Sequence, residues 1–188
     1  MSREGKRRMR KIIDPSTDII VANNTYGTFA YESKNGDLSI VLEKNGDEEN
    51  ITYAEARRLK KFFNNMSLLI VAVNSENNDV SIMDVVRGLR VTKAYEAYLD
   101  FVEELDEDEF DGVDMLDTDA LAEFVIESDL EDFKEALNTP LKQALVMTTV
   151  EMYKQRRLTD RDKQDLVNNR GEDFWSDVEA SSRAVEGH

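Results

Sequence analysis

The stretch KNGDLSIVLEKNGDEENI, residues 34–51, contains the tetrapeptide KNGD twice, ten residues apart. Asn-Gly between alternating apolar residues is the strongest short-range signal for a β-hairpin, because a type I′ turn needs positive φ angles at both central residues. We therefore interpret both copies as turns. Together with the segments on either side, they predict consecutive antiparallel strands.

The two turns predict a single apolar face. The turn centred on Asn35-Gly36 makes three facing pairs: Ser33 with Leu38, Tyr31 with Ile40, and Phe29 with Leu42. The turn centred on Asn45-Gly46 adds two pairs: Ile40 with Ile51, and Leu38 with Tyr53. Cross-strand pairs of this kind fix the register of a sheet. The opposite face is largely polar, so one face is expected to pack and the other to meet solvent.

A calcium loop is the alternative interpretation of these oxygen-rich segments. An EF-hand loop needs oxygen ligands at positions 1, 3 and 5, glycine at 6 and glutamate at 12. Both KNGD copies fail, since Tyr31 and Val41 fall at position 1. The loop around Gly112 has acids at positions 1, 3 and 5, but Thr118 stands at position 12. The sequence therefore predicts no purpose-built metal site.

Other patterns extend the fold in both directions. A short strand is predicted at 19–22, a helix capped by Thr52 at 53–64, and a strand buried on both faces at 68–73. From residue 80 the pattern becomes helical, with the following predicted spans: 82–89, 95–105, a helix to about 126 opened by Asp117 or Thr118, 129–137 capped by Ser128, 140–157, and a short helix capped by Thr159.

We therefore expect an α+β protein: a small bent β-sheet or barrel with one helix, followed by a compact bundle of short helices. The predicted parts are a basic arm at 1–13, a β-rich domain at 14–74, a helical domain at 80–170 with an acidic segment at 101–138, and a tail at 171–188. In the long helix at 140–157, Met147 and Met152 are interpreted as core residues, with a plastic docking surface as the alternative.

The composition argues against an enzyme. The chain of 188 residues has no cysteine, and its one histidine is His188, the last residue. A thiol nucleophile and a histidine general base are therefore excluded, and no glycine-rich phosphate loop is present. We expect no catalytic residues and no cofactor. No apolar run approaches the roughly 20 residues that span a bilayer, so no membrane contact is expected.

The net charge of −16 is unevenly distributed along the chain. The basic arm is a candidate nucleic-acid contact through charge alone, or a solubilising tail. Its candidate residues are Arg3, Lys6, Arg7, Arg8, Arg10 and Lys11.

Residues 101–138 contain 16 acids against Lys134 alone. This segment is interpreted as a solvated face with apolar residues packing beneath it. The alternatives are a DNA mimic and an acidic clamp for a basic partner, with these candidate partner-binding residues: Glu103, Glu104, Asp106, Glu107, Asp108, Glu109 and Asp111.

A resemblance covers residues 12–73. It is carried by IDP at 13–15, VANNTYGTFAY at 21–31, GDEENITYAE at 46–55, the basic amphipathic helix after them, and LLIVAV at 68–73. In this order the segments resemble small structural proteins of tailed bacteriophages. The resemblance implies a virion component, at the neck or tail, or an assembly factor, found in the virion or in the host cytoplasm during assembly. The expected partners are other phage proteins and further copies of this chain, because an open sheet edge invites pairing.

Overall fold

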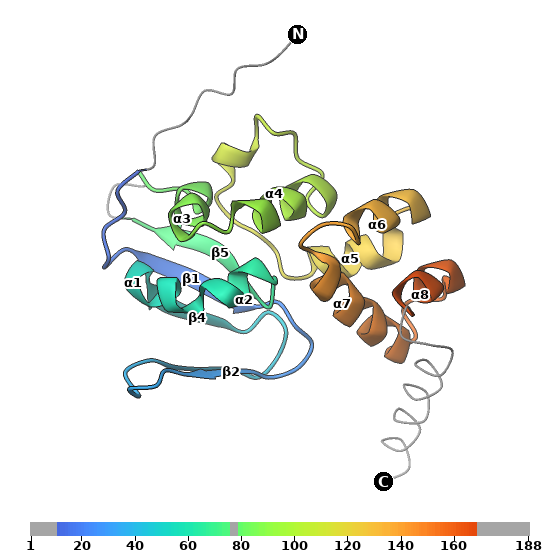
Figure 1. Ribbon diagram of the computed structural model, residues 1–188, viewed down its shortest axis with the longest axis horizontal. Helices are drawn as coiled ribbons and strands as arrows, with labels where there is room; N and C mark the ends of the chain where they lie inside the picture. Colours follow the sequence, from blue (N-terminus) through green and yellow to red (C-terminus); the bar gives the residue numbers. More distant parts are fainter. Residues whose placement is uncertain (1–10, 76–78, 169–188) are drawn as a thin grey trace.

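The chain folds as an α+β protein, as the sequence predicts (Figure 1). The computed structural model describes residues 11–75 and 79–168. The strands are β1 (Asp18–Asn23), β2 (Phe29–Glu32), β3 (Ser39–Leu42), β4 (Glu48–Thr52) and β5 (Leu68–Asn74). The helices are α1 (Tyr53–Ala56), α2 (Lys60–Asn64), α3 (Ile82–Leu89), α4 (Thr92–Phe101), α5 (Ala120–Glu127), α6 (Leu130–Ala136), α7 (Lys142–Lys154) and α8 (Arg161–Val167). Short 3-10 turns lie at Arg57–Leu59 and Phe110–Gly112.

The first KNGD copy forms the predicted hairpin, and β2 and β3 pair in the predicted register, Phe29 opposite Leu42 and Tyr31 opposite Ile40. The turn itself differs from the prediction, because of its two central residues only Gly36 has a positive φ, at 70°. The Ser33 N–H donates to Leu38 O, so the connection is wider than a type I′ turn. Asp37 holds this loop by accepting hydrogen bonds from the Ser33 hydroxyl and from Arg58.

The second predicted hairpin is wrong. β4 pairs antiparallel with β1, so the pairs predicted for Ile51 and Tyr53 with the first hairpin do not form, and Ile51 lies opposite Ile19. The KNGD segment is still a turn, with Gly46 at φ 80°, and its Gly46 N–H donates to Asn23 O at the end of β1. The apolar pattern of β4 suits either partner, because β1 and β3 both offer a buried isoleucine. The alternation alone could not choose between them.

β1 is the central strand of a three-stranded antiparallel sheet, between β4 and β5. The register with β5 skips Val71, which marks a β-bulge. At this bulge Ile70 N–H donates to the Tyr95 hydroxyl of α4 at 2.9 Å. Val71 O accepts from Leu116 N at 3.0 Å. The irregularity thus ties the sheet to α4 and to the loop that follows it.

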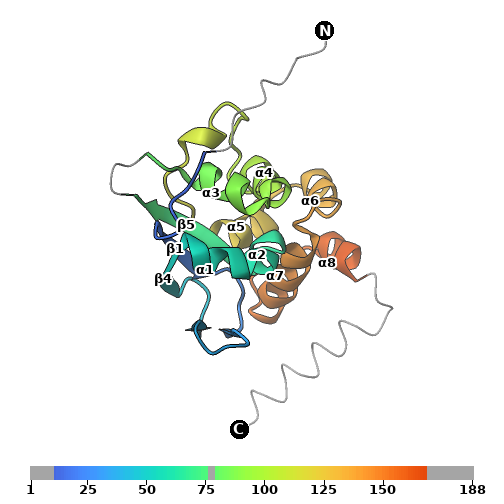
Figure 2. The same cartoon turned by 60° about the vertical axis from the view of Figure 1, so that its left-hand side comes forward.

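The helices continue the core of the sheet. α3 packs against β5, and α4 packs against α2 and α3. α5, α6, α7 and α8 gather at one end of the sheet (Figures 1 and 2). The buried apolar side chains of both parts form one continuous cluster. The division into two domains near residues 74–80 stays a prediction.

The starts of α1, α3, α6 and α8 follow local capping signals. Thr52 caps α1 as predicted and forms a capping box with Glu55, and Ser81 forms a capping box with Asp84 at α3. At two later helices the cap is the aspartate after the predicted residue: Asp129 rather than Ser128, and Asp160 rather than Thr159. Each of these carboxylates accepts hydrogen bonds from two backbone N–H groups of the first turn, where negative charge also suits the helix dipole.

Lys163 of α8 is 1% exposed and closes the C-terminal end of α5. Its Nζ donates to Val125 O at 3.0 Å and to Ser128 O at 2.5 Å. These carbonyls lie where a helix end lacks intrahelical donors. Burial lowers the pKa of Lys163, while the charges of Asp160 and Asp129 act in the opposite direction. The ammonium group therefore holds α8 against α5.

Alanine in place of Gly36 or Gly46 should destabilise the protein by about 1 kcal/mol, because a side chain resists positive φ. Gly46→Ala should cost more, since its Cβ would lie 3.2 Å from Thr118 Oγ1. Gly112→Ala is the control, because Gly112 has open space and no positive φ. Urea denaturation measures all three. Equal stabilities would contradict the turn geometry.

Lys163→Met should lower the free energy of unfolding by about 2 kcal/mol, because it leaves buried carbonyls without donors. Lys60→Met, at an exposed position of α2, is the matched control and should change it by less than about 0.5 kcal/mol. Thermal and urea unfolding give both values. A Lys163→Met protein as stable as the control would show that the ammonium group does not hold the two helices together.

Candidate functional site

The predicted contact residues of the basic arm lie mostly outside the described residues. This applies to Arg3, Lys6, Arg7, Arg8 and Arg10. Lys11 is described, and its Nζ lies 3.6 Å from Asp84 Oδ2 of α3. Lys11 is therefore part of a surface ion pair, and a nucleic-acid contact through the arm stays a prediction.

The acidic segment between α4 and α5 forms a loop whose candidate residues divide into two groups. The exposed group consists of Glu104, Asp106, Glu107, Asp108 and Glu109. The other two residues are engaged with the protein body: Asp111 pairs with Arg87 of α3, and Glu103 is half-buried. The structure thus brings five carboxylates to solvent on one loop and uses two in packing.

Apolar residues of the same loop attach it to the body, as the sequence predicts. Phe110, Val113 and Leu116 are buried. Met115 was expected to pack and is instead 76% exposed. The Leu116 N–H donates a hydrogen bond to Val71 O of β5, which is an edge strand of the sheet. The loop therefore shields part of a sheet edge that could otherwise pair with another chain.

The ionised carboxylate of Glu103 lies in an unfavourable environment. Its Oε1 is buried and has no hydrogen-bond partner among the described residues. Burial raises the pKa of Glu103, and the charges of Asp117 and Glu123 raise it further, while a hydrogen bond from the Asp117 backbone lowers it. Tyr98 donates to the Asp117 carbonyl at 2.7 Å, which fixes the backbone beside this carboxyl group. No cluster of three or more potential metal-binding side chains occurs among the described residues.

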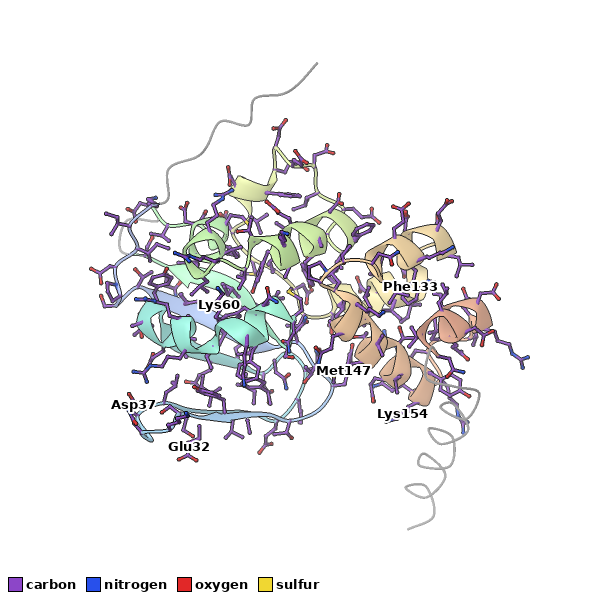
Figure 3. All side chains as sticks on the ribbon, in the orientation of Figure 1. Glu32, Asp37, Lys60, Phe133, Met147 and Lys154 are labelled. Atoms are coloured by element: carbon purple, nitrogen blue, oxygen red, sulfur yellow. The ribbon has the colours of Figure 1, made fainter. Side chains whose placement is uncertain are left out.

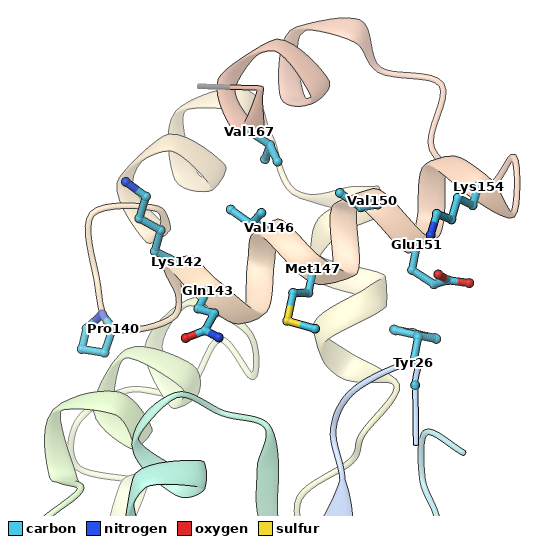
Figure 4. A pocket seen from close by; sticks show the side chains of 11 residues that line it. Tyr26, Pro140, Lys142, Gln143, Val146, Met147, Val150, Glu151, Lys154 and Val167 are labelled. Carbon is cyan, nitrogen blue, oxygen red and sulfur yellow. The ribbon is translucent and has the colours of Figure 1, made fainter. Parts of the chain in front are cut away.

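A concave surface with a partly apolar lining lies elsewhere, along α7. It is a groove of about 1040 Å³. Figure 4 shows its lining side chains, which come from α7, the bend after β1, and the end of α8. The lining residues are Tyr26, Gly27, Pro140, Lys142, Gln143, Val146, Met147, Val150, Glu151, Lys154 and Val167.

Helix α7 has apolar residues on two faces. One face is buried against α5 and α8 and carries Ala144, Leu145, Thr148, Thr149 and Met152. The other face carries Val146, Met147 and Val150, which line the groove. Met147 is 50% exposed. Val146 and Val150 are half-buried, so Met147 is the most exposed apolar side chain of this second face.

The wall opposite α7 is a bend fixed by Asn23. The buried Asn23 amide donates to Gly27 O at 2.8 Å and to Leu42 O at 3.2 Å. Its Oδ1 accepts from the backbone and hydroxyl groups of Thr25. With all its polar groups paired, the Asn23 side chain holds the bend rigidly. Tyr26, on this bend, faces Met147 across the groove (Figure 4).

The groove has positive charge near both ends of its apolar centre. Lys142 and Lys154 lie at opposite ends of α7, about 18 Å apart along its axis, and Figure 3 shows Lys154 and Met147 on this helix. Neither lysine forms an ion pair among the described residues. Glu151 is the one acid in the lining, and it accepts a hydrogen bond from Gln155. Such a surface suits an apolar peptide that carries acidic residues.

The sequence predicts both methionines of this helix, Met147 and Met152, as core residues. This is confirmed for Met152, which is fully buried, and wrong for Met147. The available signal was the spacing of Val146, Met147 and Val150, which falls out of phase with the stripe that contains Met152. Periodicity indicates two apolar stripes, but not which of them the rest of the chain covers.

No protein-family model, curated protein or solved structure matches this chain. Within residues 11–75 and 79–168, no helix is both long enough and apolar enough to cross a membrane.

Glu103→Gln should make the protein more stable at pH 7. The raised pKa means that folded Glu103 keeps its proton to higher pH than the unfolded chain, so the wild type loses stability as pH rises between the two pKa values. The difference between variant and wild type should disappear near about pH 4, where the carboxyl group is largely protonated. Glu104→Gln, at the exposed neighbour, is the control. Urea unfolding at pH 7 and pH 4 measures the free energy of unfolding of each variant. Equal changes in Glu103→Gln and Glu104→Gln at both pH values would contradict the expectation.

Proposed function

We propose that this chain is a non-enzymatic bacteriophage structural or assembly protein that acts through protein–protein contacts, with the α7 groove as its contact surface. The observation that carries the contact surface is the apolar stripe of Val146, Met147 and Val150, in which Met147 is 50% exposed and the two valines are half-buried. Such a stripe gains free energy when a partner covers it. The phage context rests on the resemblance of residues 12–73, which implies a place at the neck or tail.

The chemistry of the groove supports binding more than catalysis. Its lining combines valines, Met147 and Tyr26 with two lysines, one glutamine and one carboxylate, and the chain has neither a cysteine nor a histidine before His188. Met147 is unbranched and polarisable, which allows it to adapt to different apolar partners. The partner we propose is therefore a protein segment with apolar anchors and nearby acidic residues, supplied by another component of the particle.

A second candidate function is that of an acidic regulator or DNA mimic. The exposure of Glu104, Asp106, Glu107, Asp108 and Glu109 on one loop favours it. Carboxylates in this arrangement could occupy a basic surface of a host or phage protein, where a nucleic acid would otherwise bind. A chain with this role would be absent from purified particles and would compete with DNA for its target.

A phage lacking this gene, complemented with variants, tests the first proposal. Wild-type protein should restore infectious particles, and Met147→Asp should not, because a carboxylate in the apolar stripe opposes partner binding. Met115→Asp, the same change at an exposed methionine of the acidic loop, should restore them. Particle titre and mass spectrometry of purified particles are the measurements. Normal assembly with Met147→Asp would reject the groove as the contact surface.

A further inference from the structure

The apolar stripe of α7 needs cover even when no partner is present. Val146, Met147 and Val150 line a groove that the described residues leave open. Exposed apolar patches on a soluble chain favour association with other molecules. A segment of the same chain that covered this groove would remove that risk until a partner arrived.

The sequence that follows the described part is long enough to supply this cover. The described part ends at Asn168, directly after Val167, which itself lines the groove. Phe174 follows six residues later, and six extended residues span about 20 Å. The 13 residues of α7 are also about 20 Å long. Phe174 and Trp175 can therefore reach any point along the apolar stripe.

The charges of the two surfaces are complementary. Lys142 and Lys154 lie near the two ends of the stripe, in a chain whose net charge is −16. Residues 171–188 contain five acids and one arginine: Glu172, Asp173, Asp177, Glu179, Glu186 and Arg183. Two of these acids directly precede Phe174, and one follows Trp175 closely. The aromatic pair thus has acidic residues on both sides, as the groove has lysines on both sides of its apolar centre.

We propose that residues 171–188 dock in the α7 groove of the same molecule, with Phe174 and Trp175 on the Val146–Met147–Val150 stripe and neighbouring acids beside Lys142 and Lys154. The short connection favours docking within one chain, because it gives the segment a high effective concentration. Strongly acidic copies also repel one another. The segment then acts as an internal competitor for the groove, a consequence that rests on the proposed function.

Trp175 provides a direct readout, because it is the only tryptophan of the chain. In the full-length wild type, its fluorescence should be shielded from acrylamide quenching. Met147→Asp should raise the quenching constant severalfold and shift the emission to longer wavelength, because the aromatic pair loses its apolar contact. Met115→Asp should leave both unchanged. Circular dichroism checks that each variant keeps its fold.

Phe174→Ala provides a second test that does not depend on a change in the described part of the chain. It should also raise the quenching of Trp175, because it removes the neighbouring anchor. Equal quenching in the wild type and in both groove and tail variants would overturn the proposal. Wild-type emission that changes on dilution would overturn docking within one molecule and assign the groove to the tail of a second copy.

The two proposals fail separately. If Trp175 is unshielded while Met147→Asp abolishes particle assembly, the tail docking is rejected and the partner site stands. If Met147→Asp raises the quenching of Trp175 but still assembles normally, the tail docking stands and the partner site is rejected. One substitution thus gives independent answers in the fluorescence and assembly experiments.

Discussion

The buried amide of Asn23 is the interaction on which both the sheet and the groove depend. Asn23 ends β1, the strand that lies between β4 and β5. The Asn23 side-chain amide donates to backbone carbonyls of the bend and of β3. The Asn23 backbone carbonyl accepts a hydrogen bond from the Gly46 N–H in the second turn. A buried polar group with paired donors and acceptors permits few alternative arrangements. Asn23 therefore positions the hairpin and Tyr26 through its side chain, and the second turn through its backbone.

The parts of the fold that could be predicted are those whose determinants are local. The register of β2 and β3 follows from one turn and from alternation, and the cap of α1 follows from Thr52 and Glu55. The pairing of β4 with β1 is set by partners distant in the chain, and Ile51 would suit either neighbour. Exposure of Met147 is less predictable still, because it depends on which stripe of α7 the other helices cover. The candidate site was missed for this physical reason.

The acidic loop and the α7 groove differ in how well water stabilises their exposed side chains. Water stabilises the exposed carboxylates of Asp106, Glu107 and Asp108 without any partner, so their exposure alone does not call for one. The loop also has a structural role, because Leu116 binds the outer edge of β5. Water does not stabilise the apolar stripe around Met147 in the same way. The groove therefore makes the stronger case for an interaction surface, although the loop carries more charge.

The proposed tail docking changes how the groove would select its partners. A rigid wall at Tyr26 and an adaptable side chain at Met147 allow several apolar anchors to bind, which by itself gives little specificity. With Phe174 and Trp175 in place, the apparent affinity of any partner is reduced by the fraction of molecules whose groove is open. Weak and adventitious ligands are then excluded, and only a segment that outcompetes the tail can bind. Under this proposal, the acidic chain would gain a threshold for assembly, set by the affinity of residues 171–188 for α7.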